Sequence, residues 1–307
     1  MVKSRRNASS SGVPNVLSCT PPSRDGRPHP AVLYAARVSG AGRIFALGGV
    51  LAGCDGPTIV CAQAGNVNTG AFDPLAEIIP AAHDHGAWVH VDGAFGLWAA
   101  ASPALRHLVA GVEQADSVAT DAHKWLNVPY ESGFVLVRDP SRLGPAFGMP
   151  GAAYLPGPDA PRGGYGLLGP ESSRRARALP IWATLAAYGR AGYQALVERH
   201  CDLAAHLAAA VDAAPDLERL AEVPLNVVCF RYRPDGLSEP ELHEVNRRLG
   251  EALLDDGRVF AGGTVYGGRA ALRPAISNWR TTAADLDLFV EVVRELGAKA
   301  AGHAHPG

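Results

Sequence analysis

A lysine in an apolar setting is the first residue of this chain whose type and position favour chemistry. Lys124 lies between Ala122 and Trp125, in the segment Asp116-Ser117-Val118-Ala119-Thr120-Asp121-Ala122-His123-Lys124-Trp125. A buried ammonium is unfavourable unless it is paired, and burial lowers the pKa of an amine. We therefore expect a lysine that loses its proton and acts as a nucleophile, as Schiff-base lysines do. The alternative is a lysine whose head reaches water beside a strand.

A carboxylate at the end of the preceding strand is the second candidate. Asp92 follows the apolar residues 88–91, and the small Gly93 and Ala94 leave room for a flat ring. A Schiff-base lysine is a powerful catalyst with pyridoxal phosphate, a cofactor that needs a carboxylate beside its pyridine nitrogen. Asp92 suits that role. The alternative is an aspartate that serves only as a turn or cap residue.

The elements that must position these residues alternate between strand and helix. Apolar, β-prone runs predict strands at 58–62, 88–91, 117–120 and 133–137, and helices are expected at 46–54, 73–85 and around 104–112. This alternation predicts parallel strands with crossover helices on both faces. Ligands of such sheets bind beyond the carboxyl ends of the strands. We therefore expect Asn66, Asp92 and Lys124 to meet in one cleft.

The second half of the chain predicts a smaller αβ domain. A long Gly- and Pro-rich loop covers residues 148–172, and a helical region at 179–213 is expected to break near 189–192. Strands at 227–232, 259–265 and 271–276 and a helix at 239–254 follow. Thr282 and Asp285 resemble a capping box that opens a final helix. We place the domain boundary near residue 190.

Composition limits the class of protein. The chain has 307 residues, 47% hydrophobic and 19% charged, with a net charge of −2, which gives no indication of nucleic-acid binding. Its five cysteines show no disulfide or metal spacing, which favours reduced thiols in a cytoplasmic protein, and the histidines form no metal-binding pattern. No apolar run approaches the length of a membrane span. Residues 1–42 are basic and rich in Ser, Pro and Gly, typical of a disordered or ill-defined leader.

Several segments, in this order, resemble those of the pyridoxal-phosphate-dependent group II amino-acid decarboxylases, which include the aromatic amino-acid, histidine and glutamate decarboxylases. The similarity covers roughly residues 43–300. Its segments are Asn66-Val67-Asn68-Thr69-Gly70-Ala71-Phe72-Asp73-Pro74, His90-Val91-Asp92-Gly93-Ala94-Phe95-Gly96, Thr120-Asp121-Ala122-His123-Lys124-Trp125, Ser173-Arg174-Arg175-Ala176-Arg177, Val228-Cys229-Phe230-Arg231 and Leu272-Arg273-Pro274-Ala275-Ile276-Ser277.

The resemblance implies a fold and a cofactor. The fold is α/β, with a fold-type I transferase-like large domain at 43–190, mainly a parallel sheet and incomplete at its N-terminal part. A small C-terminal αβ domain at 191–307 follows. The implied cofactor is pyridoxal 5'-phosphate, the substrate an amino acid and the assembly a homodimer.

The resemblance also implies roles for single residues. Lys124 forms the Schiff base, Asp92 pairs with the pyridine nitrogen, and Ala94 packs against the ring. The remaining roles fall on residues near the phosphate and Schiff base (His123, Thr120), near the phenolic oxygen and the substrate (Asn66, Asn68), and on a catalytic tyrosine in the long loop (Tyr154). Arg273 either binds a substrate carboxylate or braces the small domain, and we favour bracing.

The chain departs from this family at its start. Residues 1–42 show neither the Ser/Gly-rich phosphate site nor the stacking aromatic residue that the family has before the segment resembled here. Loss of the phosphate-binding amides would weaken cofactor binding. Two alternatives to a decarboxylase therefore stay open: a fold-type I aminotransferase or other lyase, and a non-catalytic decarboxylase fragment.

Overall fold

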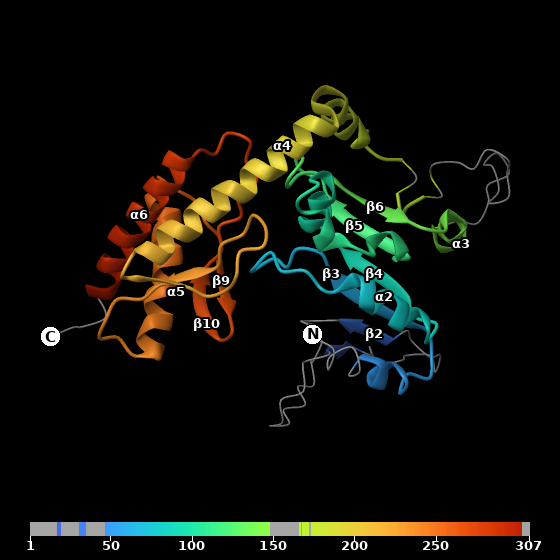
Figure 1. Cartoon of the computed structure of the whole chain (residues 1–307), viewed down its shortest axis with the longest axis horizontal. Coiled ribbons are helices and arrows are strands. Elements are labelled where there is room, and N and C mark those ends of the chain that lie inside the picture. Colours follow the sequence, from blue (N-terminus) through green and yellow to red (C-terminus); the bar gives the residue numbers. More distant parts are fainter. Residues whose placement is uncertain are drawn as a thin grey trace.

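The structure is a computed structural model that describes residues 17–19, 31–34, 47–147, 166, 168–171 and 173–302. These residues form two units on either side of a long helix, α4 (Figure 1). We call the described residues up to 147 the sheet unit and residues 190–302 the C-terminal unit. No helix in these ranges is both long and apolar enough to cross a membrane.

Six strands form the sheet of the first unit in the order β1-β2-β3-β4-β5-β6. Strands β2 to β5 are parallel, whereas β1 and β6 are antiparallel to their neighbours. The predicted parallel direction is therefore confirmed for β3 to β5 and wrong for β6, because a short link without a crossover helix joins antiparallel strands. Their bounds are β1 Leu17–Cys19, β2 Ala31–Tyr34, β3 Thr58–Gln63, β4 Trp88–Asp92, β5 Ser117–Asp121 and β6 Gly133–Val137.

The two faces of this sheet differ within the described residues. Val89 and Val91 are fully buried on the face that helix α2 (Leu75–His83) covers. His90 and Asp92 point to the opposite face, which we call the open face, and keep contact with solvent. Among the described residues, the segments that were expected to cover both faces pack on one of them. Successive right-handed crossovers that proceed in the same direction place their connecting segments on the same side of the sheet.

The connection from β4 to β5 forms short 3-10 helices where the sequence predicted one helix around 104–112. Pro103 lacks the amide that would continue the first of them, and Gly111, with φ of 88°, separates the last two. The three are η1 Gly96–Ala101, η2 Arg106–Val109 and η3 Val112–Gln114. The short elements η4 Pro140–Arg142 and α3 Leu143–Phe147 follow β6, and residues 47–51 are helical.

Helix α4 (Ala178–Ala213) joins the two units and is broken at Gly189, as predicted. Gly189 has φ of 60° and ψ of −173°, a conformation that residues with a side chain rarely adopt. Beyond the break, Val197 packs in the core of the sheet unit, and Leu207 packs in the core of the C-terminal unit. One helix therefore takes part in both cores, and Figure 1 shows it running from one unit to the other.

The C-terminal unit packs an antiparallel sheet, in the order β7-β8-β10-β9, against two helices. The Thr282–Asp285 capping box is confirmed: Asp285 Oδ2 accepts the Thr282 N–H at 2.8 Å. The sequence missed only the three-residue β7, which is too short to show a period. The elements are β7 Leu217–Arg219, β8 Phe230–Tyr232, α5 Glu239–Asp256, β9 Gly263–Tyr266, β10 Arg269–Leu272 and α6 Ala283–Gly302.

Candidate active site

The carboxyl ends of β3, β4 and β5 lie side by side. Gln63 pairs with Asp92, and Asp92 pairs with Ala119 on the next strand. Asp92 therefore ends one strand directly beside the strand that leads to Lys124. This arrangement is the expected one, in which residues from neighbouring parallel strands meet at one edge of the sheet.

The turn that carries Asp92 is fixed by the sheet itself. The Asp92 carbonyl accepts the N–H of Ala64 at 2.8 Å, and one carboxylate oxygen accepts the N–H of Ala94 at 3.1 Å. The buried Thr120 hydroxyl donates to the Gly93 carbonyl at 3.0 Å. Thr120 therefore holds the Asp92 turn. Its predicted position near the phosphate or Schiff base stays a prediction.

Lys124 is half-buried and paired, which differs from the lone buried ammonium expected from the sequence. Its Nζ lies 2.7 Å from Asp121 Oδ2 and 5.0 Å from the centroid of the Phe95 ring, and its side chain is 29% exposed. Asp121, three residues earlier at the end of β5, lies against the lysine, so the amine is paired as well as half-buried. The role of Lys124 as a nucleophile stays a prediction.

His123 lies in the same turn and faces the same carboxylate. Its Nε2 is 3.9 Å from Asp121 Oδ2, and its Nδ1 is 2.8 Å from the Ser132 carbonyl oxygen. The Tyr130 ring lies against the imidazole, with 4.1 Å between centroids. The structure therefore brings His123 and Lys124 to one carboxylate, that of Asp121, to which sequence reasoning assigned no role.

The side-chain amides of Asn66 and Asn68 stabilise the loop that carries them and connect it to the C-terminal unit. Asn66 accepts the N–H of Asn68 at 2.9 Å and donates to Gln63 Oε1 at 2.8 Å. Asn68 Oδ1 accepts the Thr264 hydroxyl at 2.8 Å. The Arg273 guanidinium donates to the Val67 carbonyl at 3.4 Å, which supports the bracing role favoured for it.

Neither asparagine of that loop has a hydrogen bond to Lys124 or Asp92, so their cofactor roles stay predictions. Ala94 follows Asp92 directly and is half-buried. Tyr154 lies outside the described residues.

Asp92 also influences its neighbours on the open face. Burial lowers the pKa of His90, against the opposite effect of the Asp92 carboxylate. Burial raises the pKa of Cys61, and Asp92 raises it further. His90 Nδ1 lies 2.8 Å from Ser117 Oγ. Burial therefore disfavours the charged forms of His90 and Cys61 on this face.

Sequence reasoning missed the residues that hold the Lys124 turn from the C-terminal unit. The Trp125 indole N–H donates to His200 Nδ1 at 2.7 Å, and Asn127 bonds to the backbone of Ser277 and Trp279. No local pattern indicates contacts between residues so far apart in the chain. The Asp121–Lys124 pair, in contrast, has an i, i+3 spacing that the sequence shows.

Comparison with known proteins places the chain in a family. Residues 52–233 match the model of the pyridoxal-dependent decarboxylase conserved domain, and the chain belongs to that family. The predicted cofactor and fold-type I architecture are confirmed at this level. A second, shorter segment, residues 4–53, matches the histidinol dehydrogenase family model. The two matches overlap only at residues 52–53.

Individual relatives agree with this family. The chain is 32% identical over 234 residues to an aromatic-L-amino-acid decarboxylase of Bacillus atrophaeus, covering 75% of this chain and 48% of the relative. It is 36% identical over 197 residues to the enzyme of the same name from Sus scrofa, covering 62% of this chain and 40% of the relative. The chain thus spans about half the length of the curated relatives it matches.

Solved structures agree as well. The structure of Oryza sativa TDC with PLP and tryptamine superposes with a TM-score of 0.76 at 28% identity, covering 83% of this chain and 54% of that one. Catharanthus roseus tryptophan decarboxylase in complex with L-tryptophan gives a TM-score of 0.71 at 26% identity, covering 84% and 53%.

The groups at the site fit pyridoxal phosphate. The cofactor requires an amine for its aldehyde and a carboxylate for its ring nitrogen, and Lys124 and Asp92, which follow adjacent strands, would supply these. One Asp92 oxygen has no hydrogen-bond partner among the described residues, so it is free to accept from a protonated ring nitrogen. At Gly93 a Cβ would lie 2.9 Å from Leu97 Cβ, so the turn beside the carboxylate has no room for a side chain.

Proposed function

We propose that this chain catalyses the pyridoxal-phosphate-dependent decarboxylation of an L-amino acid. The observation that carries the proposal is the placement of Asp92 and Lys124 beyond the ends of adjacent parallel strands. The reaction breaks the bond between Cα and the carboxylate, releases CO2 and adds a proton to Cα, which leaves an amine. When bound, the cofactor supplies the electron sink that accepts the pair left by CO2.

The residues of this chain bind and orient the reacting groups. Lys124 holds the cofactor covalently through Nζ, and Asp92 keeps a proton on the ring nitrogen. Because Asp121 pairs with Lys124 at 2.7 Å, the pair must separate before the neutral amine can react. His123 Nε2 lies 3.9 Å from the same Asp121 oxygen that Lys124 contacts. The imidazole can therefore hold a proton at Nε2, next to that oxygen.

The names of the relatives suggest which substrates to test first. They are named for aromatic amino acids, tyrosine and tryptophan. The first substrates to try are therefore L-tyrosine, L-tryptophan and L-phenylalanine, with L-glutamate and L-histidine as contrasts. An aminotransferase would consume the same amino acids but form the keto acid and no CO2.

The test uses the purified full chain with added pyridoxal phosphate. Borohydride reduction followed by peptide mass spectrometry should find the cofactor on Lys124, and CO2 should form together with the amine. Keto-acid formation without CO2 would replace the proposal with an aminotransferase. Absence of cofactor from Lys124 would leave only the non-catalytic fragment.

The assembly we propose is a homodimer that covers the first part of α4. Large apolar side chains are exposed there at intervals of three residues, so that each lies next to the following one on the helix surface. They are Leu179, Trp182, Leu185 and Tyr188. Light scattering on the purified chain should give twice the monomer mass, and Trp182→Glu should shift it to the monomer. A wild-type monomer at micromolar concentration would contradict the dimer.

A cytoplasmic location stays a proposal, supported by the free cysteines Cys54, Cys61, Cys201 and Cys229.

A further inference from the structure

The turn that carries Lys124 is held by a buried histidine on another element. Trp125, the residue after Lys124, is 1% exposed, and His200 on α4 is fully buried. The Trp125 indole donates to His200 Nδ1 at 2.7 Å, with 6.3 Å between the centroids of nearly parallel rings. This contact joins the lysine turn to α4, which belongs to both cores.

The hydrogen bonds of His200 fix its tautomer. An indole N–H can only donate, so Nδ1 must be the acceptor and Nε2 carries the proton. Nε2 lies 3.1 Å from the carbonyl oxygen of Asn278, to which it donates. Arg199 lies 3.4 Å from Nε2 and, together with burial, lowers the pKa of His200 to about 4. His200 is therefore neutral at physiological pH and bridges Trp125 to the loop before α6.

A second side chain ties the same turn to the same loop. Asn127 has φ of 55°, a left-handed conformation that asparagine tolerates. Its amide donates to the carbonyls of Trp125 and Ser277, both at 2.9 Å, and its oxygen accepts the N–H of Trp279 at 3.2 Å. The turn at 125–127 is thus connected to residues 277–279 twice: directly by Asn127, and through His200 by Trp125.

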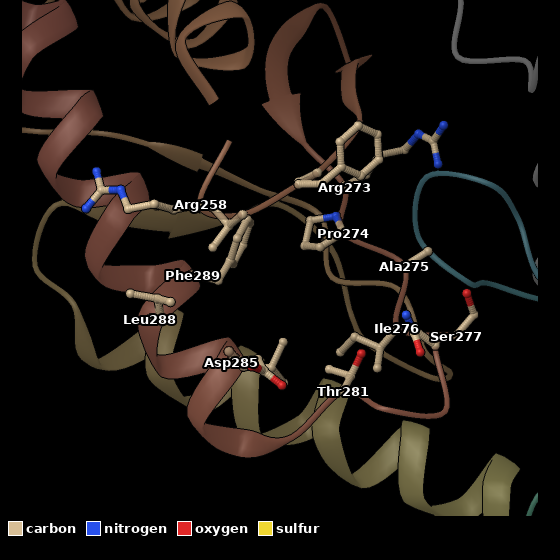
Figure 2. Close-up of a pocket in the computed structure, with 16 residues that line it drawn as sticks. Arg258, Arg273, Pro274, Ala275, Ile276, Ser277, Thr281, Asp285, Leu288 and Phe289 are labelled. Atoms are coloured by element: carbon tan, nitrogen blue, oxygen red, sulfur yellow. The ribbon is translucent and has the colours of Figure 1, made fainter. Parts of the chain in front are cut away.

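The loop that receives these bonds lies between β10 and α6. Figure 2 shows Ile276, Ser277 and Thr281 on this loop, on the wall of a cavity of about 520 Å³ in the C-terminal unit. The capping box at the start of α6 fixes the loop at its far end. The C-terminal unit therefore offers the lysine turn a fixed support in addition to the bonds between His123 and Ser132 in the sheet unit.

We propose that His200 is a positioning residue for Lys124, acting through Trp125 to hold the amine at the place where it meets the cofactor. The inference rests on the proposed function, since it assigns Lys124 the covalent role. Without His200 the buried indole loses its acceptor, and the carbonyl of Asn278 keeps only the Thr281 N–H as a donor. Buried groups without partners relax toward other partners, so the turn should open locally.

The first experiment measures the free protein and needs no cofactor. Amide hydrogen exchange of residues 122–128 should become about tenfold faster in His200→Phe, the loss expected for one buried hydrogen bond. Residues 92–96, which the sheet holds, should keep their wild-type rate. His200→Asn retains an acceptor near Nδ1 and should recover much of the protection. His206→Phe on the same helix, where the histidine is exposed and pairs with Asp287 at 2.7 Å, is the matched control.

The second experiment measures cofactor attachment to Lys124 by borohydride trapping. In His200→Phe the attachment rate should fall about tenfold and be recovered in part by His200→Asn. Unchanged exchange at 122–128 in folded His200→Phe, or equal acceleration in both segments, would overturn the proposal. If His200→Phe does not fold, Trp125→Phe removes the same bond and must give the same local change. If wild type fails to take up cofactor, the proposed function fails, while the exchange result still decides whether His200 holds the turn.

Discussion

The two residues that the proposed chemistry depends on follow adjacent strands, yet their turns are held in different ways. The Asp92 turn is fixed by neighbours within the sheet, through bonds to Ala64, Ala94 and Thr120. The Lys124 turn is bonded to Ser132 of the sheet unit through His123, and also from outside that unit, through bonds to α4 and to the loop at 277–279. The carboxylate is thus positioned by the sheet alone, whereas the amine depends on tertiary contacts as well.

The C-terminal unit therefore supports two loops at the site in addition to forming its own core. It supports the lysine turn through His200, and it supports the loop at 65–70 through Thr264 and Arg273. A change in the C-terminal unit should therefore alter the amine side of the site and leave the carboxylate side in place.

The largest effect is expected at the amine. Lys124→Ala should abolish both covalent attachment of the cofactor and CO2 release, because no other amine lies at the ends of these strands in the described part of the chain. Mass spectrometry after borohydride reduction and a CO2 assay measure the two losses. Lys299→Ala, at an exposed lysine of α6, should behave as wild type. Residual attachment in Lys124→Ala above that of unfolded protein would refute the covalent role.

Asp92→Asn should reduce CO2 release by about 10²- to 10³-fold, the usual effect of losing one oriented charge partner. The folded state should stay within about 0.5 kcal/mol of wild type, because the carboxylate is exposed and the amide still accepts the N–H of Ala94. Urea unfolding and the CO2 assay test both parts, with Asp255→Asn as the exposed control. A large loss of stability would mean that Asp92 is mainly a turn residue.

The third prediction is a pH dependence that arises on the amine side. His200 has a folded pKa of about 4, against the usual 6.5 of a histidine side chain. Between these values the unfolded chain binds a proton that the folded chain does not, so stability is full above about pH 6.5 and falls as pH decreases toward 4. The contribution is about 3 kcal/mol.

The measurement compares urea unfolding of wild type and His200→Asn at pH 7 and pH 5. The comparison between variants is needed because burial raises the pKa of Asp73 to about 6, which acts in the opposite direction and favours the folded state on acidification. Wild type should lose more stability than His200→Asn between the two pH values. Parallel losses would show that His200 is not buried as a neutral group.

The smallest effect is expected at the ion pair. Asp121→Asn removes the carboxylate that pairs with Lys124 Nζ at 2.7 Å, at a half-exposed site where such a pair contributes less than about 1 kcal/mol. Cofactor attachment should become about two- to fivefold faster, because Nζ no longer has to leave a carboxylate before it reacts. A slower reaction would show that Asp121 orients the amine more than it restrains it. Stopped-flow absorbance on wild type and variant provides both rates.

The parts of this site that the sequence predicts are local. An apolar run that ends in Asp92, and another that leads to Lys124, indicate strand ends at one edge, and the parallel pairing of β4 with β5 agrees. The break at Gly189 was also predicted, since glycine weakens a helix. Each of these depends on residues within a few positions of one another.

The features that the sequence did not predict depend on contacts between distant residues or on the direction of the chain. The sequence showed His200 only as one of several histidines without a metal pattern, and its contact with Trp125 joins residues 75 positions apart. The antiparallel direction of β6 and the open face follow from how the connections pass over the sheet, which hydrophobic periodicity does not encode. Lys124 is more exposed than its apolar neighbours in sequence indicated, because Ala122 and Leu126 pack in a small cluster and Trp125 packs in the core of the sheet unit, while the lysine stays 29% exposed.

Helix α4 has a practical consequence for dividing the molecule. Val197 belongs to one core, and Leu203 and Leu207, within three turns of the same helix, belong to the other. No single cut along the chain therefore yields two pieces with complete cores. A split-protein reporter or a pair of separately expressed halves would need α4 in both pieces, one copy to complete each core.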